Sequence, residues 1–201
     1  MNWIRTADTL APDERHLVGG KAWRLARLEQ QDFPTAPWCC IITRTYDAYL
    51  DSTGLRERMA LEIHRKAFEA MRWEELWDCA TRIRNLFLAT PLPNTLGAEL
   101  GEAIANGIGN RPAVVRSSAI DEDTGRASFA GLHDSFVNVR GVDAILKHVR
   151  LVWASLWSDA ALLYRQEIGL DVSRSAMAVV VQELVTGDSS GVTFTRDPTD
   201  D

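Results

Sequence analysis

The sequence has 201 residues, of which 46% are hydrophobic and 25% are charged, and its formal net charge at pH 7 is -6. This composition is ordinary for a folded globular protein, and nothing in it suggests disorder. A mildly acidic chain lacks the basic surface that sequence-independent nucleic-acid binding needs, and no apolar run approaches the roughly 20 residues that span a bilayer. The N-terminus also lacks the apolar core of a signal peptide, so we expect a cytoplasmic protein with no nucleic-acid partner and no membrane association.

Helical patterns dominate the first half of the chain. Gly19 and Gly20 precede an amphipathic stretch, and Thr43 or Thr45 could cap a helix that follows an apolar run. The expected elements, in chain order, are a helix over 21–30, a buried strand over 38–43, a helix over 43–50, helices within 55–88 and a helix over 96–108. Residues 55–110 are therefore expected to form a helical sub-region.

Strand patterns become frequent after residue 111. The segment TGDSS, residues 186–190, has the composition of a turn, and it separates two β-prone runs and so predicts a hairpin. The expected elements are a strand over 113–115 that ends at Arg116, a loop over 120–131, a strand over 135–139, one long helix over 142–168, and strands over 176–185 and 191–195. Together the patterns predict an α/β (α+β) chain with a helix-rich first half and a sheet region over 111–201.

Three segments have the chemistry of a phosphate and base site. Arg116 at a strand tip offers a planar fork of donors for phosphate oxygens, and Lys21 follows two glycines at a helix start. An apolar strand that runs into Gln182 and Glu183 could hold an aromatic base. Small residues that let a backbone approach an anion follow Arg116, namely Gly125, Ala127, Ser128, Ala130 and Gly131. The alternatives are an ordinary surface loop, a solvated lysine and a buried strand with a polar exit.

Five segments resemble those of one family in their amino-acid sequence and in their order along the chain. GGKAWRLARL is similar to a GGKGANLAEL-type segment, and APWCCIITRTYDAYL resembles PPGFVITTxAYxxFL. VRSSAIDEDTGRASFAGLHDSFVNV is very similar to VRSSATAEDLPxASFAGQQDTFLNV. VWASLWSDAALLYRQEIG and VVVQELVTGDSSGVTFTRDP are similar to WASLFTDRAIxYRxxxG and VVVQxMVxxDxSGVMFTxxP. These segments belong to phosphoenolpyruvate synthase (pyruvate, water dikinase), whose relatives include pyruvate phosphate dikinase and rifampin phosphotransferase.

The resemblance implies that residues 1–201 are the N-terminal part of an ATP-grasp nucleotide-binding domain. It implies a phosphotransferase that moves a phosphoryl group from ATP, through a phosphohistidine on a separate domain, to pyruvate on an acceptor domain. A rifamycin or other small-molecule acceptor and a non-catalytic nucleotide-binding paralogue are the alternatives. The ATP-binding residues that it implies are Lys21, Arg116, Gly131, Ser135, Gln182, Glu183 and Leu184.

The same resemblance implies no catalytic residue and no metal ligand within this segment, because the Mg²⁺ ligands and the phosphohistidine are expected beyond residue 201. We therefore expect the chain to be a fragment with weak ATP affinity and no phosphotransferase activity of its own. The acidic run Asp121, Glu122 and Asp123 is expected to be a solvated loop. His133 lies in the loop segment, and a direct ligand role for it stays open.

Four positions depart from the family pattern. Ala22 stands where glycine is usual, Ser135 where threonine is usual, Cys39 where glycine is common, and Ala160 where arginine is common. The change at Ala160 removes any contact that the arginine would make. The odd count of cysteines and the absence of C-x-x-C spacing predict buried free thiols, with no disulfide framework and no zinc site.

Overall fold

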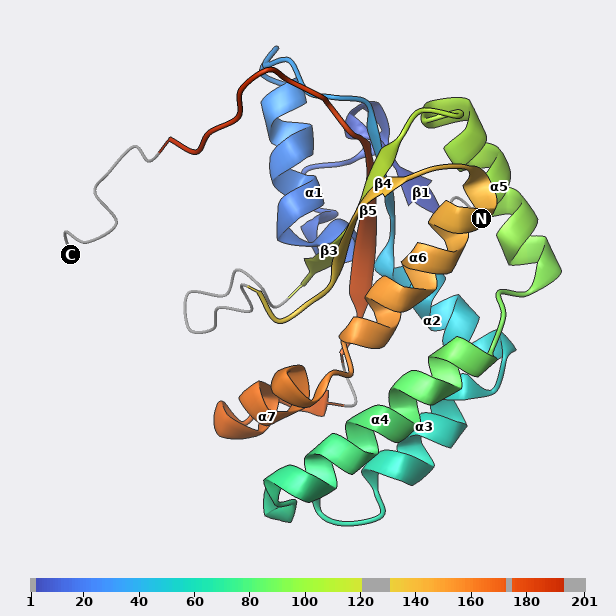
Figure 1. Cartoon of the computed structure of the whole chain (residues 1–201), viewed down its shortest axis with the longest axis vertical. Helices are drawn as coiled ribbons and strands as arrows, with labels where there is room; N and C mark the ends of the chain where they lie inside the picture. Colours follow the sequence, from blue (N-terminus) through green and yellow to red (C-terminus); the bar gives the residue numbers. More distant parts are fainter. Residues whose placement is uncertain (1–2, 121–130, 173–174, 194–201) are drawn as a thin grey trace.

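The computed structural model describes residues 3–120, 131–172 and 175–193, and in this part of the chain helices pack on both faces of a five-stranded sheet (Figure 1). The expected α+β class is confirmed. In chain order the elements are β1 (Ile4–Arg5), the 3₁₀ turn η1 (Ala7–Thr9), α1 (Arg15–Glu29), β2 (Trp38–Ile41), α2 (Thr43–Ser52), α3 (Leu55–Ile63), η2 (Phe68–Ala70), α4 (Trp73–Ala89), α5 (Asn94–Gly107), β3 (Ala113–Ala119), β4 (Ser135–Val139), α6 (Val142–Ser155), α7 (Asp159–Glu167) and β5 (Met177–Glu183).

β5 lies at the centre of the sheet although it is the last strand among the described residues. The strand order is β1-β2-β5-β3-β4, and every neighbouring pair is antiparallel. β5 pairs with β3 along its whole length, from Glu183 opposite Ala113 to Met177 opposite Ala119. Because helices cover both faces of the sheet, β5 is apolar on both sides and its first five residues are buried.

The hairpin predicted from residues 176–185 and 191–195 is wrong. Both edges of β5 are already paired, one with β2 and the other with β3, so a following strand has no place beside it. Residues 184–193 form no strand, and Phe194 and Thr195 lie outside the described residues.

The two faces of the sheet carry separate apolar clusters. On one face, Val18 and Ala22 of α1 pack against Cys40 of β2 and Val180 of β5. On the other face, α6 packs against β3 and β5, and Figure 1 shows α1 and α6 on opposite sides of the sheet. Each strand residue is therefore assigned to the α1 face or the α6 face by the alternation of side chains along the strand.

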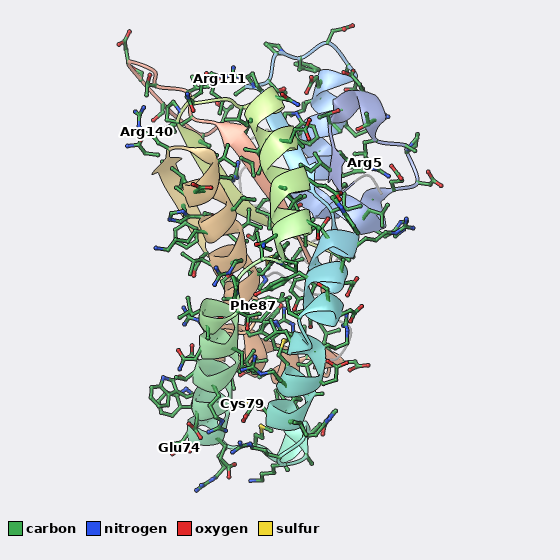
Figure 2. The ribbon with its side chains drawn as sticks, turned by 90° about the vertical axis from the view of Figure 1, so that its right-hand side faces the viewer. Arg5, Glu74, Cys79, Phe87, Arg111 and Arg140 are labelled. Carbon is green, nitrogen blue, oxygen red and sulfur yellow. The ribbon has the colours of Figure 1, made fainter. Side chains whose placement is uncertain are left out.

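The helical end of the molecule, where α3 and α4 lie (Figure 1), joins the sheet through an aromatic cluster. Tyr46 and Tyr49 of α2 contact Phe87 of α4 and Trp153 of α6, with ring centroids 5.3–6.2 Å apart. Trp157 Nε1 donates to the Tyr46 hydroxyl at 2.9 Å in this buried cluster. Figure 2 shows Phe87 at the start of the helical end, with Cys79 and Glu74 further out along α4. One apolar cluster thus includes residues of both the helical part and the sheet.

The predicted helix over 142–168 is two helices. The stripe of Ile145, Val149, Val152 and Leu156 is buried as expected, but the chain turns at residues 156–158. The Ser158 side chain accepts from the Ala161 N–H at 3.2 Å and so caps the start of α7.

The predicted N-caps of α2 are also wrong. The capping position is Ile42, while Thr45 Oγ1 donates to the Trp3 carbonyl at 3.0 Å and Thr43 Oγ1 donates to the His16 carbonyl at 3.5 Å. Both threonine hydroxyls therefore connect α2 to earlier parts of the chain.

The cysteines are buried free thiols, as expected from their spacing. Burial raises the pKa of Cys39 to about 12, so that this thiol stays protonated at neutral pH. No helix in the described ranges is both long and apolar enough to cross a membrane.

α1 is broken at Gly19, and the break allows a close approach to β3. Gly19 has φ 72° and ψ 177°, a backbone conformation that residues with a Cβ rarely adopt. A Cβ at this position would lie 2.2 Å from the Ser118 carbonyl oxygen. The expected helix over 21–30 is thus the second segment of α1, and a glycine does open it.

We expect Gly19→Ala to destabilise the protein by about 2–3 kcal/mol, because the substitution adds backbone strain and a backbone clash. For a chain of this length this corresponds to a fall in Tm of roughly 5–10 °C, measurable by thermal denaturation followed by circular dichroism. Gly107→Ala is the matched control, since a Cβ there has no neighbouring heavy atom within 4 Å. Equal Tm values for the two variants would contradict the importance of this contact.

Candidate functional site

Three of the site residues predicted on the strands lie on the α1 face of the sheet, while Glu183, opposite Ala113, projects to the α6 face. Arg116 of β3 is opposite Ser135 of β4 and Val180 of β5, and Gln182 is opposite Val114. Cross-strand partners project to the same face, and so do residues two apart on one strand. Arg116, Ser135 and Gln182 therefore share one face, on which α1 packs at Val180.

The sequence suggested that Arg116 lies at a strand tip, but the structure places it within β3. β3 continues for three more residues to Ala119, because β5 offers pairing partners along its whole length. Arg116 is half-buried, and within the described residues its guanidinium forms no hydrogen bond or ion pair. Its position in mid-strand gives it a fixed backbone, and its charge is not neutralised by the described residues around it.

A bulge in β4 places Ser135 beside Arg116. Ala113 is opposite Val139, but Val115 is opposite Phe136, so β4 contains one extra residue between these pairs. Asn138, within this stretch, has φ 58°. The extra residue shifts the register by one, which turns Ser135 rather than Phe136 to the α1 face.

Ser118 fixes the α1 segment that carries Lys21. The Ser118 hydroxyl donates to the Val18 carbonyl at 2.7 Å and accepts from the Ala22 N–H at 3.2 Å. It therefore satisfies a donor in the first turn of the second segment of α1, as a capping side chain does. Lys21 precedes Ala22 and is held near the end of β3. Ser118 belongs to the VRSS motif, yet no sequence signal singled it out.

The segment before β4 is tied to the corner between α6 and α7. The Asp134 N–H donates to Ser155 Oγ at 3.0 Å, and Ser155 Oγ donates to the Val152 carbonyl at 2.7 Å. Ser158 Oγ donates to the Leu132 carbonyl at 3.5 Å. Gly131, at the start of this segment, has φ 79°, and a Cβ there would have no described heavy atom within 4 Å. The other small residues of the predicted phosphate loop, 125–130, lie outside the described residues, as do Asp121, Glu122 and Asp123.

His133 is buried within the electrostatic influence of two positively charged groups. Burial lowers its pKa to about 4, with further lowering by the charges of Arg165 and Lys21. The imidazole is therefore neutral at pH 7. The fully buried Arg165 of α7 donates to the Leu156 carbonyl at 2.7 Å and the Ala161 carbonyl at 3.3 Å. Arg165 was missed in the sequence, although an arginine within an apolar helical stretch is a recognisable signal.

We call Gln182–Leu184, the strand exit that the sequence predicts to hold a base, the hinge segment. Several hydrogen bonds hold it to the rest of the protein. The Glu183 N–H donates to the Pro37 carbonyl at 2.8 Å, and the Leu184 N–H donates to the Pro112 carbonyl at 2.8 Å. Gln182 Nε2 donates to the Ala36 carbonyl at 3.4 Å. Both backbone N–H groups are thus engaged, so a base edge would have to use other backbone groups of this segment.

The phosphate-type and base-type groups are close enough for one nucleotide. Arg116 is opposite Val180, and Gln182 is two residues further along β5. At a rise of about 3.3 Å per residue this offset is roughly 7 Å along the strand. The described residues that gather here supply ammonium, guanidinium and hydroxyl groups, which do not fit the oxygen-rich set that Mg²⁺ prefers. Among described residues there is also no group of three His, Cys, Asp or Glu side chains that could hold a metal.

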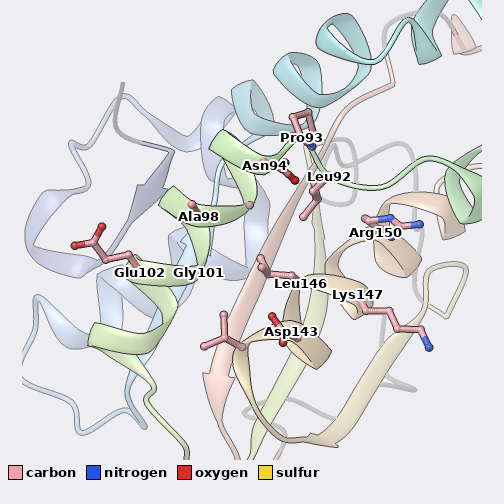
Figure 3. Close-up of a pocket in the computed structure, with 12 residues that line it drawn as sticks. Leu92, Pro93, Asn94, Ala98, Gly101, Glu102, Asp143, Leu146, Lys147 and Arg150 are labelled. Carbon is pink, nitrogen blue, oxygen red and sulfur yellow. The ribbon is translucent and has the colours of Figure 1, made fainter.

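Two cavities of the molecule lie away from this site. One of about 490 Å³ lies between α5 and α6 and is lined by Ala98, Gly101 and Leu146 among others (Figure 3). Another, of about 520 Å³, lies between the α3–η2 region and the end of α7. None of Lys21, Arg116, Gly131, Ser135 and the hinge segment lines either cavity. The register of the strands, rather than cavity volume, is therefore what locates the site.

Residues 15–201 match the family model described as the pyruvate phosphate dikinase AMP/ATP-binding domain. A probable phosphoenolpyruvate synthase of Methanothermobacter thermautotrophicus is 34% identical over 98% of this chain and 29% of its own length. The phosphoenolpyruvate synthase of Aeropyrum pernix is 34% identical over 95% of this chain and 24% of its own length. A rifampicin phosphotransferase of a Streptomyces species is 38% identical over 90% of this chain and 21% of its own length.

The chain therefore spans less than a third of the length of these relatives. The match covers nearly all of the present sequence, including each strand on which the site residues lie. By this match the chain belongs to the pyruvate phosphate dikinase AMP/ATP-binding domain family.

Proposed function

We propose that this chain is the ATP-binding N-terminal segment of a phosphoenolpyruvate-synthase-like phosphotransferase. The observation that carries the proposal is the placement of Arg116 beside Ser135, on the same sheet face as Gln182 and under α1. One face thus offers a cation and a hydroxyl for phosphate oxygens and a strand exit for a base. Family membership supports ATP as the nucleotide.

The phosphate end is supported by its electrostatics. Arg116 has no partner among the described residues, and Lys21 and Arg165 both act on His133 with positive charge. A phosphate chain would compensate the charge of Arg116, and charge-assisted hydrogen bonds are about twice as strong as neutral ones. Lys21, Arg116, Gly131 and Ser135 are accordingly proposed as the phosphate-binding residues.

The base end is proposed to be the hinge segment. Gln182, Glu183 and Leu184 follow the buried part of β5, where its valines give way to partly exposed residues. Since the N–H groups of Glu183 and Leu184 bind proline carbonyls, we propose that the base contacts the remaining backbone groups here.

The complete reaction is proposed to need more protein than this sequence contains. The curated relatives are more than three times as long as the part that this chain matches. We propose that the Mg²⁺ ligands, the phosphohistidine and the pyruvate-binding region are supplied by the remainder of a full-length chain. Accordingly, we expect the 201-residue chain to release no AMP from ATP, measured by chromatography of the nucleotides. Release of AMP would contradict this part of the proposal.

A rifamycin acceptor is the second candidate function. Relatives named rifampicin phosphotransferase are 31–38% identical to this chain, which is as similar as the phosphoenolpyruvate synthases. ATP-dependent phosphorylation of pyruvate and of rifampicin by the full-length protein, compared by mass spectrometry, distinguishes the two acceptors. ATP binding with no transfer to either would favour a non-catalytic nucleotide-binding paralogue.

We expect Arg116→Ala to weaken ATP binding by about tenfold or more, which corresponds to about 1.4 kcal/mol. The reason is the loss of a planar donor fork for the phosphate oxygens. An NMR-detected titration of the 201-residue chain into the millimolar range measures weak binding directly. Arg84→Ala, which removes an exposed arginine of α4, is the control and should leave the affinity unchanged. Equal ATP affinity of wild type and Arg116→Ala would refute the site.

His133 predicts a specific dependence of stability on pH. The folded chain keeps it neutral down to about pH 4, whereas the unfolded chain protonates it near pH 6.5. Because the unfolded state binds more protons in this window, the stability from this residue is complete above pH 6.5 and falls as the pH is lowered towards 4. Between pH 7 and 5, wild type should lose about 1–2 kcal/mol more free energy of unfolding than His133→Gln.

Urea denaturation at both pH values measures this difference. His64→Gln removes an exposed histidine and should follow the wild-type pH dependence. A His133→Gln variant that loses stability as steeply as wild type would show that His133 is not held neutral.

A further inference from the structure

The guanidinium of Arg111 connects the end of α5 to the end of β5. Its Nε donates to the Ile108 carbonyl at 2.8 Å, and its Nη2 donates to the Gly107 carbonyl at 2.6 Å. Its Nη1 donates to Glu183 Oε2 at 2.6 Å. Carbonyls in the last turn of a helix lack intrahelical partners, so Arg111 satisfies two of them and an acidic group at once.

The residue after Arg111 holds the next position of the hinge segment. The Pro112 carbonyl accepts from the Leu184 N–H at 2.8 Å, and Glu183 is opposite Ala113 in the sheet. Proline also has a fixed φ, which limits the conformations open to this dipeptide. Residues 111–113 therefore hold Glu183 and Leu184 through one side chain and through the backbone.

The carboxylate of Glu183 is committed to this connection. The family resemblance suggested Glu183 as an ATP contact, yet its side chain forms an ion pair with Arg111 and its N–H binds the Pro37 carbonyl. What it can still offer a base is its backbone carbonyl, whose position depends on these bonds. Binding sites lose affinity and selectivity when such groups move by about 1 Å.

We propose that Arg111 is a positioning residue for the base-binding end of the site, and that it acts through Glu183 without touching the nucleotide. The inference rests on the proposed function, because it requires the base to lie against the hinge segment. The charge of Arg111 is not the reason for its effect on ATP binding, since a phosphate chain would lie towards Arg116, on the far side of Gln182 along β5.

The exposure of this ion pair makes the inference testable without loss of the fold. The Arg111 and Glu183 side chains are 44% and 26% exposed, and ion pairs with such exposure contribute little to global stability. Substitution of Arg111 is therefore expected to change the hinge segment and leave the apolar clusters intact.

The experiment compares ATP with inorganic tripolyphosphate, which has the charge but no base, in NMR-detected titrations of the 201-residue chain. Arg111→Ala should weaken ATP binding about three- to tenfold and leave tripolyphosphate binding unchanged. Arg111→Lys keeps the charge without the donor fork and should behave like Arg111→Ala. Arg140→Ala removes an exposed arginine at the same end of the molecule (Figure 2), and it should change neither affinity.

Glu183→Gln provides an independent test, because it breaks the ion pair from the other side and keeps the side-chain size. Glu183→Gln should weaken the binding of ATP and leave the binding of tripolyphosphate unchanged. The double variant with Arg111→Ala should bind ATP no more weakly than either single variant. Wild type that binds neither ligand would refute the proposed function itself. If wild type binds ATP, either of two results would overturn the positioning role alone. Arg111→Ala could bind ATP as tightly as wild type, or it could lose affinity for ATP and tripolyphosphate by the same factor.

Discussion

The pairing of β5 with both β2 and β3 is the constraint on which the rest of this structure depends. β2 and β3 are separated by more than 70 residues, and they become parts of one sheet only through β5 between them. This central strand supplies apolar side chains to α1 on one face and to α6 on the other. It also aligns Val180 with Arg116 and Gln182 with Val114, so the geometry of the candidate site follows from the register of this one strand.

A second constraint fixes α1 over the sheet. The backbone of Gly19 passes so close to the Ser118 carbonyl that no side chain fits, and the Ser118 hydroxyl bonds to the backbone on both sides of the break. The backbone at Lys21 is therefore held in place by the contacts of Ser118 with Val18 and Ala22. The first glycine of the GGK segment has a physical reason here, because both the positive φ and the close approach require a glycine.

The two ends of the proposed nucleotide site are stabilised in different ways. At the phosphate end, positive groups gather without a described carboxylate to neutralise Arg116, which leaves charge for an anion to compensate. At the hinge segment, polar groups are already bonded to the protein through Pro37, Pro112 and Arg111. The first arrangement favours binding energy and the second favours a fixed geometry. Both ends lie beside β5, away from the cavity between α5 and α6 and the one beside α7.

The sequence by itself determined the α+β class, the family, most strands and the buried stripe of α6, because local periodicity and motif wording carry that information. It did not determine where β3 ends, that 142–168 is two helices, or that 184–193 forms no strand beside β5. Only the tertiary structure decided these points, since strand length and pairing depend on partners far away in the chain. The same holds for the β4 bulge that sets Ser135 beside Arg116 and for the ion pair of Glu183 with Arg111, 72 residues apart. Neither leaves a local pattern, because each arises only when distant backbone segments are packed together.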